Sequence, residues 1–202
     1  MRPASSGGKT AFRILIKMII LAFLAAYAAA AILVHCPTDL SKIEGHGSTG
    51  ERSVDLLSRL ETAVATRSET TSIEEEEINN YIASLLDATQ EGYSADYVDF
   101  KGVWVDFSKD KCIIYMEREA FGRPSTIGLE LKITREGDKF LTQFTAAHYG
   151  RMKLPSGFLL LVKHAYDRLA RDVFSKELEL IFKMNQIRFD ENRMVLDPRF
   201  PS

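Results

Sequence analysis

Hydrophobic residues form one unbroken stretch near the start of the chain, Met18 to Val34, which is seventeen residues without a charge. At about 1.5 Å per residue such a helix spans about 26 Å, close to the roughly 30 Å hydrocarbon core of a bilayer. All four bases of the leader, residues 1–17, precede it, and the first acid is Asp39. The bias of positive charge toward the cytoplasm therefore predicts a single-pass anchor over 18–35, with a cytoplasmic N-terminus and a periplasmic or otherwise extracytoplasmic domain.

Two other fates of this segment stay open. Ala26-Tyr27-Ala28 before Ala29 fits the small-x-small site of a cleaved signal peptide, although apolar residues continue for six positions beyond it. Lipidation of Cys36 is another, although a histidine precedes the cysteine where a lipobox has a small residue. A buried helix of a soluble protein is disfavoured by the one-sided charge.

After the anchor, the pattern becomes amphipathic. Residues 36–51 are rich in Gly, Ser, Thr and Pro, which predicts a flexible juxtamembrane linker. Apolar residues then recur at helical spacing in 52–65 and again in 72–88, which predicts two helices. Ser72 and Glu75 have the spacing of a capping box at the start of the second helix.

Beyond Gly92 apolar residues alternate with polar ones, which is typical of β-strands. Four such segments separated by turns predict an antiparallel meander over 98–107, 112–119, 126–134 and 140–145. The first segment carries apolar side chains on both faces, so it requires cover on both sides.

The last third of the chain returns to helical spacing. Residues 155–174 predict a helix that is apolar around more than half its circumference. Alternation over 178–182 predicts a further strand, and 187–189 with 194–196 predicts a small hairpin. The sum is an α+β domain over 52–202, in which a curved antiparallel sheet of five to six strands packs against two or three helices.

Charge and cysteine content narrow the class of protein. Without the four bases of the leader, 22 bases and 28 acids remain, a net charge of about −6. This balance argues against a nucleic-acid partner and against a polybasic grip on anionic lipid. With two cysteines, Cys36 and Cys112, we expect no disulfide, and Cys112 is interpreted as a small core residue.

The sequence carries no catalytic signature. It contains no Gly-x-Ser-x-Gly elbow, phosphate loop, His-Glu-x-x-His pair or Cys-x-x-Cys. The glutamates at 74–77 point around a helix and complement the positive end of its dipole, so we expect no metal and no cofactor. A non-enzymatic protein is favoured. The alternative, a hydrolase, requires His148 to lie within hydrogen-bond reach of an acid and a nucleophile.

The apolar surplus is the most distinctive property of the domain. Packing of helices on both faces of the sheet would absorb it, and this is the simpler outcome. A groove for a lipid or another apolar ligand is the second outcome. The candidate groove residues are Phe100, Trp104, Phe158, Leu161 and Tyr166.

Two short motifs resemble YpmS-like small membrane-anchored bacterial envelope proteins. Residues 76–82, EEINNYI, resemble the helix start that follows the anchor in that family, and 149–155, YGRMKLP, is similar to a segment before its apolar helix. The resemblance spans about 72–196 and implies a relation to tubular lipid-binding folds, which favours the groove. It supplies no catalytic residues, and the helix predicted over 52–65 departs from the family pattern.

The function expected from the sequence is a membrane-tethered, non-enzymatic envelope protein that binds lipid or another apolar ligand between sheet and helix. The alternative is a scaffold or assembly factor that presents an exposed apolar patch to a membrane-protein partner. Reversing charges on the polar face of the sheet should impair the scaffold and spare the ligand-binding protein.

Overall fold

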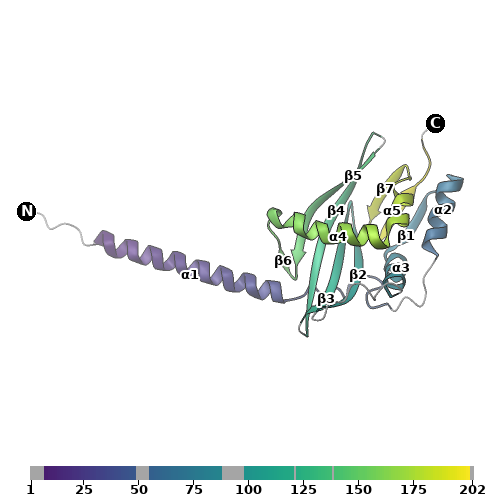
Figure 1. Cartoon of the computed structure of the whole chain (residues 1–202). Helices are drawn as coiled ribbons and strands as arrows, with labels where there is room; N and C mark the ends of the chain where they lie inside the picture. Colours follow the sequence, from purple (N-terminus) through teal and green to yellow (C-terminus); the bar gives the residue numbers. More distant parts are fainter. Residues whose placement is uncertain (1–6, 49–54, 88–97, 121, 138, 201–202) are drawn as a thin grey trace, which may run out of the picture.

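The fold is α+β, as the sequence pattern predicts, with an N-terminal apolar helix, two antiparallel sheets and several further helices (Figure 1). The structure is a computed structural model and describes residues 7–48, 55–87, 98–120, 122–137 and 139–200. The start of the expected leader, the end of the expected linker, the first residues of the helix expected from Arg52 and the segment around Gly92 lie outside the described residues.

The elements follow one another in the order in which they are numbered, helices and strands separately. The helices are α1 (Gly7–His35), α2 (Leu56–Thr66), α3 (Glu75–Asp87), the short 3-10 helix η2 (Ser156–Phe158), α4 (Leu159–Val173) and α5 (Ser175–Ile181). The strands are β1 (Thr71–Glu74), β2 (Val98–Ser108), β3 (Lys111–Ala120), β4 (Arg123–Glu136), β5 (Lys139–Tyr149), β6 (Met152–Lys153), β7 (Gln186–Asp190) and β8 (Arg193–Asp197).

Helix α1 projects away from the rest of the molecule (Figure 1). Its segment Phe12–Leu33 has 22 residues, is apolar enough to cross a membrane, and buries none of its most apolar window against the domain. At about 1.5 Å per residue it is about 33 Å long, which matches a bilayer core. This helix is compatible with a membrane anchor; an N-terminal signal sequence meets the same criteria.

The predicted four-stranded meander is confirmed. Strands β2 to β5 pair antiparallel in chain order, and β6 adds a fifth, very short strand, so that β2 forms one edge of the sheet. The predicted terminal hairpin is also confirmed, as β7 and β8. These two strands do not extend the large sheet but form a separate three-stranded sheet with β1.

The capping box expected at Ser72 and Glu75 is not formed, because residues 71–74 form strand β1 and pair with β8. Helix α3 begins instead at Glu75, whose backbone N–H donates to the Asn192 carbonyl over 2.8 Å. The Glu75 carboxylate accepts hydrogen bonds from the backbone N–H groups of Phe107 (2.7 Å) and Glu44 (2.9 Å). Bonds between distant parts of the chain thus replace the local cap.

The prediction of a strand over 178–182 is wrong, because this segment belongs to helix α5 and to the turn that follows it. Leu178 and Ile181, one helical turn apart, both face the interior of the domain. The alternation of apolar residues in this short segment fits a strand and a short helix equally, and contacts with the core select the helix.

The segment 36–48, which we call the strap, differs from the flexible linker expected there. It lies on the face of the large sheet opposite α4 and buries Leu40 and Ile43, which are 4% and 8% exposed. At its start, the backbone N–H of Arg151 donates to the carbonyls of Leu33 and Cys36, both over 3.1 Å. The end of α1 is therefore joined to the domain by a packed segment.

Candidate functional site

A cavity of about 480 Å³ lies between the five-stranded sheet and the helices that cover it. Its floor is one face of β2, β3 and β4, and Val105, Ile114 and Leu129 are among the side chains that line it. Its roof comes from α3, α4 and α5, and β7 and β8 close one end. The volume falls within the roughly 300–1,000 Å³ of typical ligand pockets.

The walls of this cavity are predominantly apolar. Most lining residues also belong to the main hydrophobic core, and others, such as Lys163 and Phe182, lie at the surface, so the cavity reaches from the core to solvent. Apolar walls of this kind favour apolar ligands. The arrangement therefore suits a hydrocarbon chain better than a charged metabolite.

Two tyrosines bring polar atoms to the walls. The hydroxyl of Tyr81 on α3 donates to Oε1 of Glu177 on α5 over 2.6 Å, and the Glu177 side chain is buried. Burial, reinforced by the Glu177 carboxylate, raises the pKa of Tyr81, so the hydroxyl keeps its proton. The Tyr81–Glu177 pair is thus a fixed polar point in an otherwise apolar wall.

Tyr166 fixes α4 to the sheet. Its hydroxyl lies 3.0 Å from the carbonyl oxygen of Ile114 and 2.6 Å from that of Ile127, on adjacent strands. Burial raises the pKa of this tyrosine as well, so it acts as a hydrogen-bond donor. The helix is held over the cavity at this point by a specific polar contact in addition to apolar packing.

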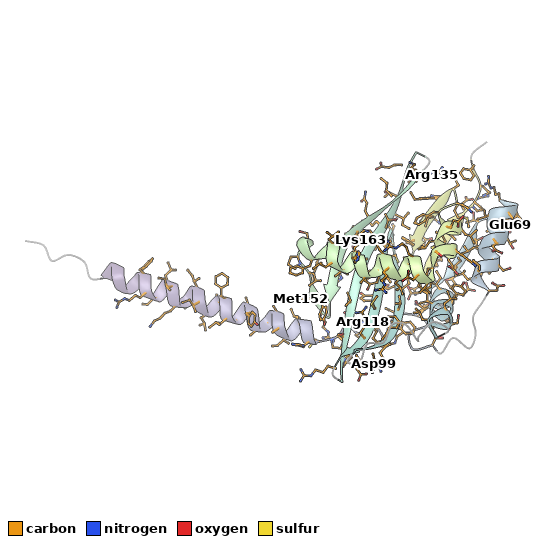
Figure 2. All side chains as sticks on the ribbon, in the orientation of Figure 1. Glu69, Asp99, Arg118, Arg135, Met152 and Lys163 are labelled. Atoms are coloured by element: carbon orange, nitrogen blue, oxygen red, sulfur yellow. The ribbon has the colours of Figure 1, made fainter. Side chains whose placement is uncertain are left out.

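On the β5 side the cavity boundary is more polar and less buried. Lys163, labelled on α4 in Figure 2, pairs with Asp167 one turn along the helix. The Lys163 ammonium also lies 5.2 Å from the centre of the Phe144 ring. All three residues line the cavity and are half-buried, so solvent reaches this edge of the cavity.

The five residues predicted from the sequence to line a groove are not brought together. Tyr166 lines the cavity. Phe100 is partly buried against the main core, outside the cavity lining. Phe158 and Leu161, at the start of α4, are 53% and 69% exposed. Trp104 lies on the opposite face of the sheet.

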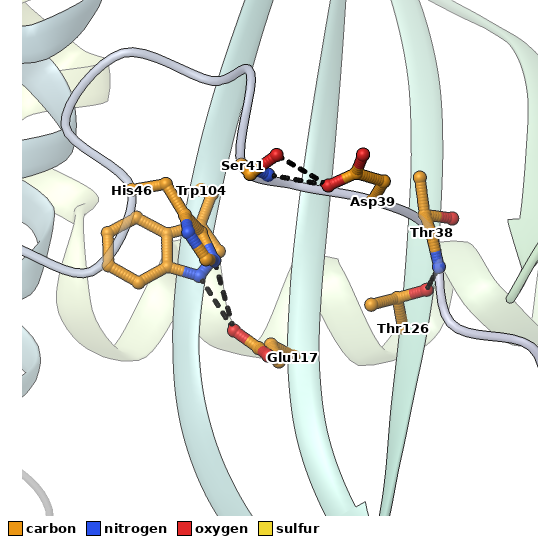
Figure 3. Close-up of polar contacts among 7 residues, drawn as sticks. All are labelled: Thr38, Asp39, Ser41, His46, Trp104, Glu117 and Thr126. Carbon is orange, nitrogen blue, oxygen red and sulfur yellow. Dashed lines mark hydrogen bonds and ion pairs between the residues drawn. The ribbon is translucent and has the colours of Figure 1, made fainter.

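Trp104 packs beneath the strap, as Figure 3 shows. Its indole is 5% exposed, and its Nε1 donates to Glu117 Oε2 over 3.3 Å. The His46 ring stands edge-on to it at 4.8 Å between centroids and also contacts Glu117 Oε2, at 3.4 Å. The two-faced apolar pattern of β2 is thus satisfied by the cavity on one side and by the strap on the other.

Glu177 is the cavity residue that sequence reasoning missed. Glu177 lies between the helix predicted over 155–174 and the strand predicted over 178–182, so the sequence pattern assigns it to neither element, whereas the structure places it in α5. Its partner Tyr81 lies within the helix predicted over 72–88. The one-turn spacing of Leu178 and Ile181 was the available signal that Glu177 also begins a helical turn toward the core.

His148 is the side chain on which the hydrolase alternative depends. Its Nδ1 is buried and has no hydrogen-bond partner in the described part of the chain. Burial lowers the pKa of the imidazole, and Lys153 and Lys111 add to this, while Glu130 opposes it. Within the described residues, no group of three or more His, Cys, Asp or Glu side chains could hold a metal ion.

A second hollow, of about 590 Å³, lies beside α2. Its lining comes only from residues 58–72, and most of these are exposed polar residues. It is a surface feature between a helix and the segment that follows it. The cavity under α4 is the better candidate because distant parts of the chain converge on it.

Neither a protein-family model nor a curated protein matches this chain. The choice of the candidate site therefore rests on the geometry of the cavity and on the chemistry of its walls.

Proposed function

We propose that this chain is a membrane-tethered, non-enzymatic protein that binds an apolar ligand, the acyl chain of a lipid, in the cavity between the five-stranded sheet and α3 to α5. The observation that carries the proposal is a predominantly apolar cavity of about 480 Å³ between the sheet and the helices that cover it. A domain on a helix suited to a bilayer has acyl chains within its reach. The resemblance of residues 76–82 and 149–155 to YpmS-like envelope proteins favours the same ligand class.

The walls suggest how such a ligand would lie. An acyl chain would occupy the apolar space between Leu129 and Leu169, and burial of its methylene groups would supply the binding free energy, about 0.8 kcal/mol for each. The polar end of the ligand would lie at the half-buried boundary near Lys163 and Asp167, where water can reach it. Hydrogen-bonding groups there would fix the orientation of the ligand.

The test fills the cavity from α4. Ala170 lines the cavity and Ala165, five residues earlier, is exposed on the same helix. The full chain is placed in phosphatidylcholine nanodiscs that contain a fatty acid with a diazirine in its chain, irradiated, and digested for mass spectrometry. We expect adducts on peptides containing Leu129 and Leu169. These adducts should fall several-fold in Ala170→Trp and remain at the level of the unaltered protein in Ala165→Trp.

Adducts confined to residues 12–33 of α1 in the unaltered protein would overturn the proposal, as would equal labelling of the cavity peptides in both tryptophan variants. Because a large side chain in a packed core can strain it, the thermal unfolding of Ala170→Trp is measured in parallel. A folded Ala170→Trp protein that has lost the cavity adducts separates blockage of the site from unfolding.

A further inference from the structure

The first turn of α4 and the 3-10 helix before it carry an apolar tip formed by Phe158, Leu160 and Leu161. Their exposed fractions are 53%, 73% and 69%. Among the described residues after α1, these are the three most exposed large apolar side chains. Contiguous exposed apolar groups of this kind mark an interaction surface.

The exposed side of α4 changes character along its length. After the apolar tip, its exposed positions other than Ala165 are occupied by polar and charged residues, among them His164, Arg168 and Arg171. Leu159 and Val162, next to the tip residues in sequence, pack against the core instead. The exposed side of α4 is therefore apolar only at its first turn. A helix that packs lengthwise against a partner helix would instead be apolar along its whole exposed side.

The tip lies on the side of the domain from which α1 projects. The backbone N–H of Arg151 donates to the Leu33 carbonyl at the end of the apolar span, and β6 contacts α1 directly. Phe158 follows Arg151 by only seven residues, which at no more than about 3.6 Å per residue keeps it within about 25 Å. Figure 1 shows α4 starting on the α1 side and running away from it, and Figure 2 places Met152 on the same side.

The charge around the tip suits a lipid surface. Arg151 and Lys153 are exposed between the end of α1 and the tip, and no acidic residue occurs between Arg151 and Lys163. Basic side chains at the level of the headgroups and apolar side chains beyond them are the arrangement of interfacial membrane-binding segments.

We propose that the tip inserts into the surface of the bilayer that α1 crosses, so that the domain touches the membrane at a second point. The occupant of the tip is the bilayer itself, because the tip lies on the side of the domain at which the apolar span of α1 ends. The inference rests on the tethered part of the proposed function and is independent of any ligand in the cavity. It also places one end of α4, the roof of the cavity, in contact with lipid.

The experiment measures the depth of the tip in vesicles of phosphatidylcholine and phosphatidylglycerol. Leu160→Cys is labelled with an environment-sensitive fluorophore in the full chain carrying Cys36→Ser; Cys112, 4% exposed, stays unlabelled. We expect a blue-shifted emission that lipids with a doxyl group near the headgroup quench strongly. The matched control is Arg171→Cys, exposed near the far end of the same helix, which should be neither shifted nor quenched.

Unquenched fluorescence at Leu160→Cys would overturn the proposal, and self-quenching between labelled copies would identify a second copy as the occupant. The same measurement in a protein that also carries Ala170→Trp separates the two proposals. Quenching at the tip without photoadducts in the cavity would leave the tip proposal standing and overturn the ligand proposal. Cavity adducts without quenching would do the reverse.

Discussion

The side-chain amide of Asn79 pairs with both backbone groups of Val105, accepting from its N–H over 2.7 Å and donating to its carbonyl over 2.9 Å. Val105 lies on β2, the edge strand of the large sheet, and its N–H and carbonyl would otherwise be unpaired. The same Nδ2 donates to the Glu44 carbonyl of the strap over 2.7 Å. An asparagine on a helix therefore takes the place of a neighbouring strand and joins sheet, helix and strap.

Replacing Asn79 by alanine should destabilise the domain by about 2–4 kcal/mol, because a buried polar group that loses its partner costs about 1–3 kcal/mol. Chemical unfolding followed by circular dichroism measures the loss. The matched control is Asn80→Ala, which changes the adjacent, only half-buried asparagine. A similar stability of the two variants would contradict the role assigned to Asn79.

The fluorescence of Trp104 should show whether the strap covers the sheet, because Trp104 is the only tryptophan in the chain and lies beneath the strap. In Ile43→Ser a buried side chain of the strap becomes polar, so we expect red-shifted emission and stronger iodide quenching. Lys42→Ser alters the exposed neighbour and should leave the spectrum unchanged. Unchanged emission in both variants would show that the strap does not depend on Ile43.

Acid should destabilise the domain through His148. Because burial lowers the folded-state pKa of this residue below 6.5, the unfolded chain binds more protons, and stability falls as the pH drops below about 6.5. The difference in unfolding midpoint between pH 7.5 and pH 5.5 should shrink in His148→Gln. His164→Gln, at an exposed position on α4, is the control and should keep the full difference; an equal effect of both changes would contradict the prediction.

Removing the Tyr166 hydroxyl should loosen α4 over the cavity. Tyr166→Phe keeps the ring in the core and loses the hydrogen bond to the carbonyls of β3 and β4, at a cost of about 1 kcal/mol. We expect faster hydrogen exchange of the α4 amides, measured by mass spectrometry, with unchanged exchange in β7 and β8. Uniformly faster exchange across the domain would indicate a general loss of stability instead.

The sequence predicts those parts of the fold in which the spacing of apolar and polar residues follows the period of a helix or a strand. In the strand around Ile127 to Ile133, alternate positions face the core, and the period of two identified it. Strand β1 and helix α5 were missed because they are short and their conformation depends on distant partners. Pairing of Thr71 with Leu196, 125 positions later, leaves no mark on the local pattern.

The candidate site was predictable only in outline. The apolar residues on both faces of β2 are covered, but the second face is covered by the strap and not by a helix, and part of the apolar surplus of α4 is exposed. The apolar pattern did not indicate which face the strap covers, so Trp104 was assigned to the groove together with Tyr166. Nor does the apolar character of Phe158 and Leu161 distinguish a cavity wall from an exposed tip, since both environments favour the same residue types.

The strap has a consequence for where the folded unit begins. A fragment cut at residue 52, after the stretch that reads as a linker, would lose Leu40 and Ile43 and uncover Trp104, and it would also remove the Glu44 backbone groups that Glu75 and Asn79 bind. Cleavage after Ala28, at the small-x-small site, would leave all of these contacts in place, together with the Leu33 carbonyl that Arg151 binds. The domain thus keeps its contacts with the strap when residues 1–28 are removed and loses them when the chain is cut at Arg52.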